Sequence, residues 1–205
     1  QCKCEEDIAK CIEFASSNKL DIAVKSGGHS ICGDCLSDTG LVIDLSSMKR
    51  VNVEKVQNSA YCAIATVEPG CLLGDVDTAC KPFGVACVSG LASHTGITGL
   101  TLGGGIGWLS RQYGLACDNV ISMRVVLSNG SIVEISADNE YSDLFWALKG
   151  AGIGASFCVV SQFKFKCYPV KTVNAGIYVY TPFTRKHLEK YVHEIIPMCN
   201  QFEMT

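Results

Sequence analysis

Residues 96–108 read GITGLTLGGGIGW and residues 25–30 read KSGGHS, and these two glycine-rich stretches decide how the chain is interpreted. Glycine has no Cβ, so its backbone can approach an anion closely and adopt φ > 0 without strain. Successive backbone N–H groups in such turns form anion-binding concavities. Because one stretch also carries His29, the pair indicates a cradle for a large phosphorylated cofactor with a nucleophile beside it.

The composition is that of a folded protein. The chain has 205 residues, of which 48% are hydrophobic and 18% charged, and a net charge of −3. That charge gives no reason to expect a nucleic-acid or anionic-membrane partner. The apolar runs are too short to span a bilayer. Since the chain begins with Gln1 and has no signal-peptide pattern, we expect an excised segment, and both a cytoplasmic and an extracellular location remain open.

Thirteen cysteines are scattered through segments that otherwise have the pattern of core elements. A buried free thiol acts as a small hydrophobic side chain. Cys32 and Cys35 have the C-x-x-C spacing of redox and zinc motifs. A tetrahedral zinc site needs a second such pair, and the sequence offers none, so a coincidence within a loop is the favoured interpretation and no metal site is predicted.

Hydrophobic periodicity and turn residues predict an α+β fold in which strands outnumber helices. Helices are predicted over residues 5–18, 72–81, 141–149 and 184–199. Strands are predicted over residues 21–25, 41–45, 51–55, 61–67, 121–127, 132–135, 157–165 and 174–181. Asn129-Gly130 lies between two of these strands and predicts a tight hairpin.

A Rossmann dinucleotide site is excluded by spacing. Such a site needs G-x-G-x-x-G between a strand and a helix. Residues 103–107 read GGGIG and residues 150–154 read GAGIG, which do not fit, and no P-loop motif is present. A nucleotide cradle of another kind is therefore required.

Several motifs, in order along the chain, resemble the FAD-linked oxidases of the berberine-bridge-enzyme-like group, within the vanillyl-alcohol-oxidase type. The segments that carry the resemblance are residues 25–30, 41–46, 67–70, 95–109, 113–119 and 143–150. The match extends over about residues 7–168. It implies a two-lobed FAD-binding domain of the PCMH type, with mixed and antiparallel sheets and flanking helices.

The resemblance implies a covalent cofactor. In this family the Gly-Gly-His turn wraps the FAD pyrophosphate, and the histidine bonds to the 8α-methyl of the flavin; His29 is the matching residue. A neutral imidazole suits this bond because one ring nitrogen has a free lone pair. Some members add a cysteinyl link near the second glycine stretch, but no cysteine occurs between Cys87 and Cys117. A single histidyl link is therefore expected.

Further FAD contacts follow from the same resemblance. The residues expected to contact the cofactor, besides His29, are Lys25, Ser26, Gly27, Gly28, Ser30, Ser93, Thr95, Gly96, Gly99, Leu100, Gly103, Gly104, Asp118 and Asn119. Lys25 stands where the family more often has Arg, so bidentate geometry is lost. Asp118-Asn119 alone would be interpreted as a turn pair. His94 is interpreted as a polar loop residue in preference to a catalytic one.

Two departures from the family pattern stand out. Residues 149–158 read KGAGIGASFC where many relatives read RGAGASFG, which is an insertion near Ile153-Gly154 with Cys158 in place of a glycine. A side chain at that position could crowd the cofactor or a neighbouring strand. The second departure is truncation: residues 1–170 are predicted to be the FAD-binding domain, and residues 171–205 the start of a truncated substrate-binding domain.

The predicted function is that of an FAD-dependent oxidase. It would take hydride from an alcohol, sugar or amine C–H to flavin N5, and dioxygen would reoxidise the flavin to give hydrogen peroxide. The catalytic base and most contacts with the small-molecule substrate are expected outside this chain, and the oligomeric state is not predicted. The alternative is a degenerate or non-catalytic flavin-fold fragment without turnover. A third hypothesis, a thiol-redox or metal protein built on Cys32 and Cys35, ranks below these.

Overall fold

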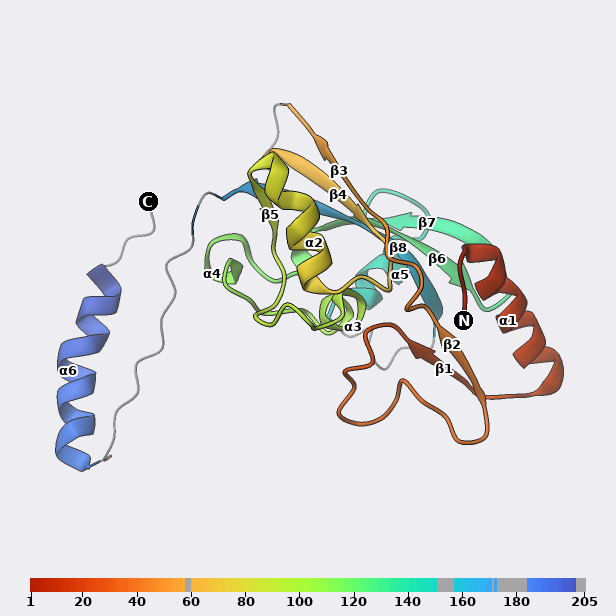
Figure 1. Cartoon of the computed structure of the whole chain (residues 1–205), viewed down its shortest axis with the longest axis horizontal. Coiled ribbons are helices and arrows are strands. Elements are labelled where there is room, and N and C mark those ends of the chain that lie inside the picture. Colours follow the sequence, from red (N-terminus) through yellow and green to blue (C-terminus); the bar gives the residue numbers. More distant parts are fainter. Residues whose placement is uncertain (58–59, 151–156, 171, 173–183, 202–205) are drawn as a thin grey trace. The chain divides into compact units, whose positions relative to one another are not determined.

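The computed structural model describes residues 1–57, 60–150, 157–170, 172 and 184–201 (Figure 1). The chain divides into two compact units, Gln1–Thr172 and Val173–Thr205. Within the second unit, α6 (Arg185–Gln201) is the element described. The strand predicted over residues 174–181 lies outside the described residues. No helix in the described part of the chain is both long enough and apolar enough to cross a membrane.

The first unit is built on an antiparallel sheet whose central strand is the long β8 (Cys158–Pro169). One side of β8 pairs with β4 (Ala63–Val67), which in turn pairs with β3 (Val51–Lys55). The other side pairs with β6 (Val120–Leu127) and then, beyond the end of β6, with the short β5 (Val85–Cys87). The strand β7 (Ile132–Ser136) completes the sheet by pairing with β6.

The sheet separates two hydrophobic cores because successive side chains on a strand point to opposite faces. Val125 of β6 and Val160 of β8 belong to the main core, together with the fully buried Phe163 and Phe165. Their neighbours Val126 and Val159 belong to a second, smaller core. This arrangement gives the two-lobed α+β architecture that the sequence predicts.

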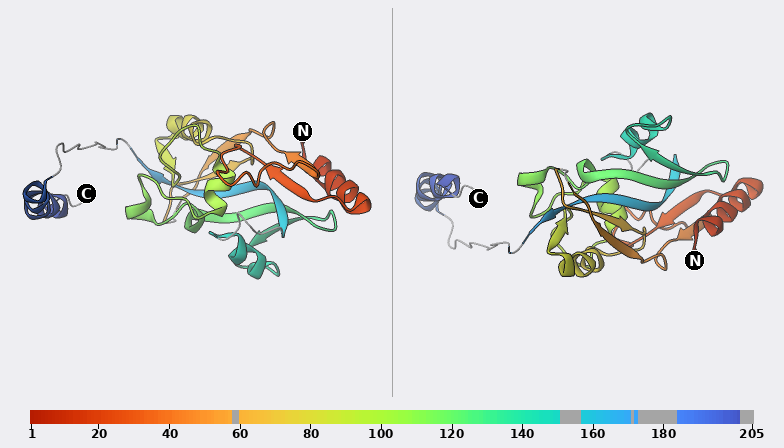
Figure 2. Two further views of the ribbon diagram at one scale, coloured as in Figure 1. Left: turned by 90° about the horizontal axis from the view of Figure 1, so that it is seen from below. Right: turned by 90° about the horizontal axis from the view of Figure 1, so that it is seen from above.

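Helices α2 (Leu73–Cys80), α3 (Ile97–Leu102) and α5 (Ser142–Leu148) lie on one side of the sheet, over the main core (Figures 1 and 2). Each contributes apolar side chains to that core, including Val76, Ile97 and Phe145. Short helical turns complete this lobe: η1 (Lys81–Phe83), α4 (Ser110–Tyr113) and η2 (Cys117–Asn119).

The smaller lobe consists of α1 (Glu5–Asn18) and a parallel pair of strands, β1 (Ile22–Lys25) and β2 (Leu41–Asp44). The apolar side chains predicted for the helix pack here: Ile8 and Ile12 meet Ile43 and Leu45 in the smaller core. The long connection between β1 and β2 contains the first glycine stretch, so this lobe presents residues 26–30 at its edge.

Most predicted elements are observed with ends shifted by a few residues. The Asn129-Gly130 hairpin is observed: Gly130 has φ 80°, and the Asn129 side chain accepts the Ser131 N–H at 3.0 Å. Several elements differ. Neither β5 nor the short helix α4 is predicted from the sequence. The strand β8 runs to Pro169, past the predicted end at 165, because β5 gives it a further partner. The second glycine stretch includes the helix α3, since Ile97, Thr98 and Thr101 find buried positions on one helical face.

One partly buried ion pair joins the two lobes. Arg124 on β6 donates from Nε and Nη2 to the two carboxylate oxygens of Glu5 on α1, at 2.8 and 2.6 Å. Ser161 on β8 donates to the same carboxylate at 2.6 Å. The Arg124 hydrogen bonds, and then the one from Ser161, lower the pKa of Glu5 despite its partial burial. The bidentate contact fixes the start of α1 on the sheet.

We predict that Arg124→Met lowers the free energy of unfolding by about 1–2 kcal/mol, because it leaves a half-buried carboxylate without its cation. A folded-state pKa below the normal value stabilises the fold fully above the normal Glu range, and this stabilisation is lost as the pH falls through the lowered folded-state pKa. Urea unfolding at pH 7 and pH 3 should therefore show a smaller wild-type advantage at pH 3 than at pH 7.

Lys164→Met is the matched control, because the Lys164–Glu134 pair joins two strands with both side chains exposed. We expect a change of less than about 0.5 kcal/mol there. Equal losses in the two variants, or a loss in Arg124→Met that is undiminished at pH 3, would contradict the assignment.

Candidate cofactor site

The two glycine stretches, far apart in the sequence, are in direct backbone contact. A Cβ added to Gly27 would lie 2.6 Å from the Gly96 Cα, and one added to Gly96 would lie 2.7 Å from the Gly27 Cα. Real Cβ atoms do not approach backbone this closely. Both positions therefore require glycine, because a side chain on either residue would overlap the backbone of the other.

A single carbonyl ties the stretches together. The hydroxyls of Ser26 and Thr98 both donate to the Pro69 carbonyl oxygen, at 2.5 and 2.7 Å. The turn that presents this carbonyl is itself fixed, since the Gly70 N–H donates to Met48 and a Cβ at Gly70 would lie 2.3 Å from the Leu45 oxygen. The Val67–Gly70 motif thus acts as the junction between the two lobes.

The second stretch is anchored against the start of α2. The N–H groups of Leu73 and Gly74 donate to the carbonyls of Thr95 and Ser93, and the Ile97 N–H donates to Cys71. Residues 93–97 therefore follow the α2 backbone before α3 begins. Further along, Gly104 and Gly105 have φ values of 105° and 79°, a conformation that glycine adopts without strain.

His29 lies exposed on the loop that follows Gly28, whose φ is 71°. Its ring centroid is 5.4 Å from that of His94, which is also exposed. No pattern in the sequence pairs these two imidazoles. One regularity could have revealed the pair. Each histidine lies two residues from one of the two glycines in contact: His29 from Gly27, and His94 from Gly96.

Lys25 does not point a free charge at the site. Its Nζ lies 3.3 Å from the Asp44 carboxylate on the neighbouring strand β2. Hydrogen bonds from Ser46 and the Lys25 ammonium lower the pKa of Asp44. The ion pair joins the ends of β1 and β2, so an anion bound at this loop would meet backbone N–H groups more than a lysine.

Comparisons with known proteins agree with this geometry. A family described as "FAD binding domain" matches residues 1–136. An FAD-linked oxidoreductase, pgmH of Aspergillus terreus, is 41% identical over 191 residues, which is 93% of this chain. The chain belongs to the FAD-binding domain family. The resemblance to FAD-linked oxidases seen in the sequence is thereby confirmed.

Solved structures support the same assignment for the fold of the FAD-binding domain. The crystal structure of 6-hydroxy-D-nicotine oxidase from Arthrobacter nicotinovorans has a TM-score of 0.76 at 35% identity, over 82% of this chain and 36% of the other. Glucooligosaccharide oxidase from Acremonium strictum, in a structure with 6-S-cysteinyl, 8α-N1-histidyl FAD, has a TM-score of 0.73 at 34% identity, over 82% and 34% of the two chains. The chain spans 37% of the length of pgmH.

Asp118 and Asn119 lie within the FAD-binding domain as a structural pair. The Asp118 carboxylate accepts the Leu115 N–H at 3.0 Å. The buried Asn119 amide donates to the carbonyls of Tyr113 and Leu115 and accepts the Tyr168 hydroxyl at 2.7 Å. These bonds use its hydrogen-bonding groups inside the protein. The pair fixes the turn after α4 to β8, so any effect on a cofactor would come through the position of that turn.

Two observations test whether FAD fits the residues present. The first is the Thr101 hydroxyl in α3, the one buried side-chain nitrogen or oxygen that lacks a hydrogen-bond partner in the described part of the chain. The second is the exposure of large apolar side chains beside both stretches: Ile31, Leu91, Ile106 and Trp108 are 102%, 61%, 72% and 54% exposed. The uncovered apolar groups fit a site completed by a further group, whereas the Thr101 hydroxyl is fully enclosed by the protein and would reach such a group only after a local shift.

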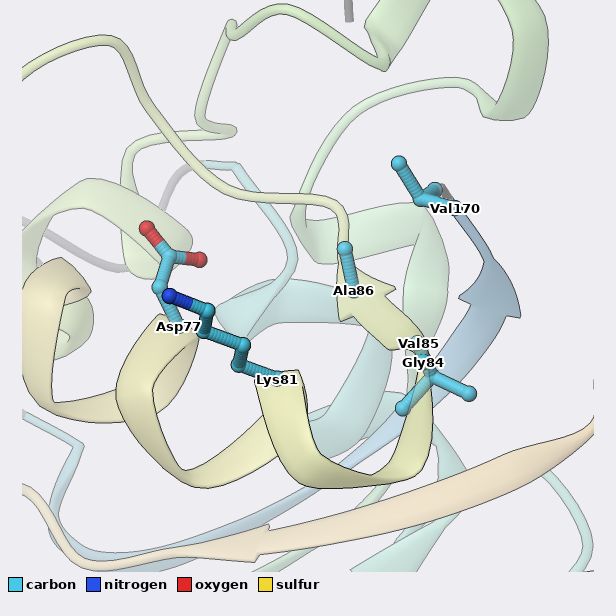
Figure 3. Close-up of a pocket in the computed structure, with 6 residues that line it drawn as sticks. All are labelled: Asp77, Lys81, Gly84, Val85, Ala86 and Val170. Atoms are coloured by element: carbon cyan, nitrogen blue, oxygen red, sulfur yellow. The ribbon is translucent and has the colours of Figure 1, made fainter. Parts of the chain in front are cut away.

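Other candidate features lie elsewhere or contribute nothing to this site. A hollow of about 470 Å³ is lined by Asp77, Lys81, Gly84, Val85, Ala86 and Val170, none of which belongs to the glycine stretches (Figure 3). Cys32 is exposed and Cys35 partly buried, and neither belongs to the one metal-type cluster found among the described residues. The insertion near Ile153-Gly154 lies outside the described residues, whereas Cys158 packs against the main core.

We predict that Gly27→Ala destabilises the FAD-binding domain by about 1–3 kcal/mol and weakens cofactor retention, because the new methyl meets the Gly96 backbone. Gly99→Ala is the matched control for stability alone, because Gly99 is itself an expected cofactor contact: a Cβ there meets no protein atom within 4 Å, and alanine favours the α3 helix by up to about 1 kcal/mol. Thermal unfolding compares the two variants, and bound-flavin absorbance measures cofactor retention in Gly27→Ala against the wild type. A stability of Gly27→Ala equal to that of Gly99→Ala would contradict the observed contact.

Proposed function

We propose that this chain is the FAD-binding part of an oxidase that holds its cofactor covalently through His29. The observation that carries the proposal is the joint between Gly27 and Gly96, at which His29 lies exposed on the following turn. FAD bound there would accept hydride at N5 from a substrate C–H next to oxygen or nitrogen and pass the electrons to dioxygen, giving hydrogen peroxide.

The proposed cofactor contacts fall into two groups. Residues 26–30, with Ser93, Gly96 and Gly99, would supply backbone N–H groups to the pyrophosphate and ribityl chain. The N–H groups of Thr95, Leu100, Gly103 and Gly104 already donate to carbonyls of the chain, so these four residues would contact the cofactor through their other atoms. Lys25, Asp118 and Asn119 would act through position, because their polar groups already bind Asp44, Leu115 and the turn before β6. Substituting these three residues should therefore affect FAD binding by displacing the loops that they hold, and not by removing a direct contact with the cofactor.

The covalent link is proposed at His29 alone. Glucooligosaccharide oxidase carries an FAD bonded to both a cysteine and a histidine. In this chain the segment before the second stretch reads GLASHTG, without a cysteine. The ring centroid of His94 lies 5.4 Å from that of His29, and no bond to the flavin is proposed at His94.

The remainder of the oxidase is proposed to lie beyond the FAD-binding domain. Residues 1–170 would form that domain, and residues 171–205 would begin the part that binds a small-molecule substrate and covers the flavin. Support comes from the greater length of the relatives and from the uncovered apolar side chains beside the glycine stretches. The catalytic base would belong to that further part.

We predict that the full-length protein is yellow and that its colour remains with the acid-precipitated protein. His29→Ala should release the colour to the supernatant or prevent flavin binding, because the bonding imidazole is gone. His94→Ala is the matched control and should keep the acid-stable colour, since it removes the neighbouring ring and leaves the tether. Visible absorption of pellet and supernatant measures the outcome.

Two results would count against the proposal. Acid-stable colour in His29→Ala would place the tether elsewhere. A colourless wild-type protein after expression with added riboflavin would favour the alternative, a flavin-fold protein without turnover.

A further inference from the structure

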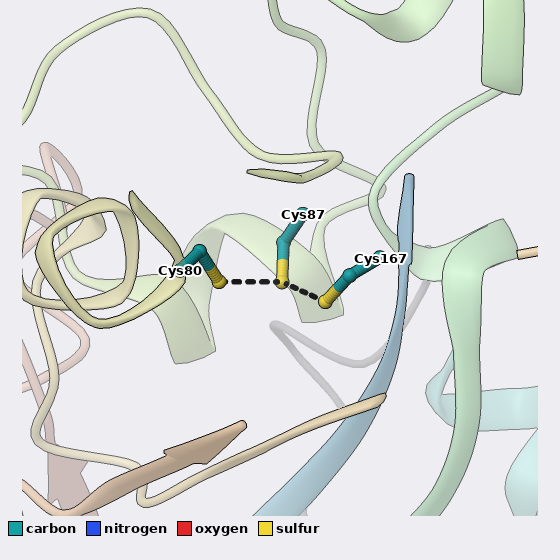
Figure 4. Close-up of side chains that lie close together, drawn as sticks. All are labelled: Cys80, Cys87 and Cys167. Carbon is teal, nitrogen blue, oxygen red and sulfur yellow. Dashed lines mark hydrogen bonds between the residues drawn. The ribbon is translucent and has the colours of Figure 1, made fainter. Parts of the chain in front are cut away.

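Three cysteine sulfurs meet in the main core, away from the glycine stretches. Cys80 ends α2, Cys87 ends β5 and Cys167 lies on β8; their Sγ atoms all lie within 4.8 Å of one another (Figure 4). The Cys87 and Cys167 sulfurs are 3.0 Å apart, and those of Cys80 and Cys87 are 3.9 Å apart. The side chains are 1%, 2% and 0% exposed. We call these three residues the sulfur triad.

The Cys87–Cys167 pair has the backbone geometry of a cross-strand disulfide. The two residues are direct partners in the antiparallel β5–β8 ladder. The Cys167 carbonyl accepts the Cys62 N–H on the opposite side, and Val170 donates to Gly84, so Cys87–Cys167 is a non-hydrogen-bonded pair. Such pairs have Cα atoms about 4.5 Å apart, within the range of about 4.4–6.8 Å that a disulfide spans.

The surroundings favour a disulfide over a metal ion. All three sulfurs belong to the hydrophobic core, where charged thiolates are costly. Zinc in a structural site takes four ligands, and the cluster offers three among the described residues. Hydrogen bonding among the thiols and burial raise the pKa of Cys87, which keeps that thiol neutral. A disulfide carries no charge and needs no fourth partner.

We propose that Cys87 and Cys167 are the site of an intramolecular disulfide that forms when a peroxide oxidises the folded protein. The first thiol attacks the peroxide O–O bond and becomes a sulfenic acid, with release of water. The second thiol then displaces the sulfenic hydroxyl as a second water, and the S–S bond forms. Hydrogen peroxide is thereby reduced by two electrons and the two thiols are oxidised by two.

This bond would fix the base of the second glycine stretch. The strand β5 has three residues and pairs with β8. It leads directly to Ser89-Gly90, whose backbone lies against Gly107: a Cβ there would lie within 3 Å of both carbonyl oxygens. A covalent tie at Cys87 would therefore hold one end of that stretch to the central strand of the sheet.

Mapping the linked cysteines tests the proposal on the purified protein. The protein is treated with hydrogen peroxide, its remaining thiols are blocked with N-ethylmaleimide in denaturant, and chymotrypsin digestion is followed by mass spectrometry. Cleavage after Phe83 separates Cys80 from Cys87. We expect a Cys87–Cys167 linked peptide that dithiothreitol removes, formed faster at pH 9 than at pH 7 because both reactions need a thiolate. The oxidised protein should unfold at a temperature higher by roughly 5–15 °C.

Variants separate this link from other sulfur chemistry. Cys167→Ala should lose the linked peptide and the temperature shift. Cys71→Ala is the matched control, since Cys71 is buried in the same core but its sulfur contacts the Arg50 carbonyl. The proposal is overturned if wild-type Cys87 and Cys167 stay free after oxidation, if either is linked to Cys80 instead, or if equimolar zinc or copper copurifies and is lost in Cys167→Ala. The wild-type map decides the question even if Cys167→Ala does not fold.

Discussion

The contact between Gly27 and Gly96 is the constraint on which the rest of the FAD-binding domain depends. It brings the edge of the smaller lobe against the helix-bearing face of the larger one, and no side chain fits between them. The Pro69 carbonyl, which accepts Ser26 and Thr98, holds both stretches at that distance. Packing in the two cores then positions the two glycine-rich loops. As a consequence, the exposed His29 lies next to the contact between Gly27 and Gly96.

Helices and hairpins were predicted well where residues close together in the sequence determine them. The apolar spacing of Ile8 and Ile12 specified α1, and Asn129-Gly130 specified the β6–β7 hairpin. The helix α3 was missed because glycine-rich sequence has low helix propensity, which the buried positions of Ile97 and Thr101 override. The length of β8 was underestimated because it depends on β5, a partner far away in the chain.

The cofactor contacts stay predictions, and the contacts within the chain around the site were only partly foreseeable from the sequence. The glycine stretches could be recognised from motif order, yet the Lys25–Asp44 pair and the His29–His94 neighbourhood arise only from folding. Cysteine spacing drew attention to Cys32 and Cys35, which are three residues apart in the sequence. The sulfur triad unites residues from α2, β5 and β8, and the spacings between these cysteines in the sequence match no known cysteine motif.

The position of β8 also governs how the protein can be made. It pairs with β4, β5 and β6, all of which precede it in the chain. During synthesis those strands emerge from the ribosome before their shared partner exists, so their edges stay open until residues 158–169 appear. Open edges are templates for wrong pairing, and non-local pairing of this kind is slow. The pairing of β4, β5 and β6 with β8 is therefore completed only once the whole of the FAD-binding domain has been synthesised.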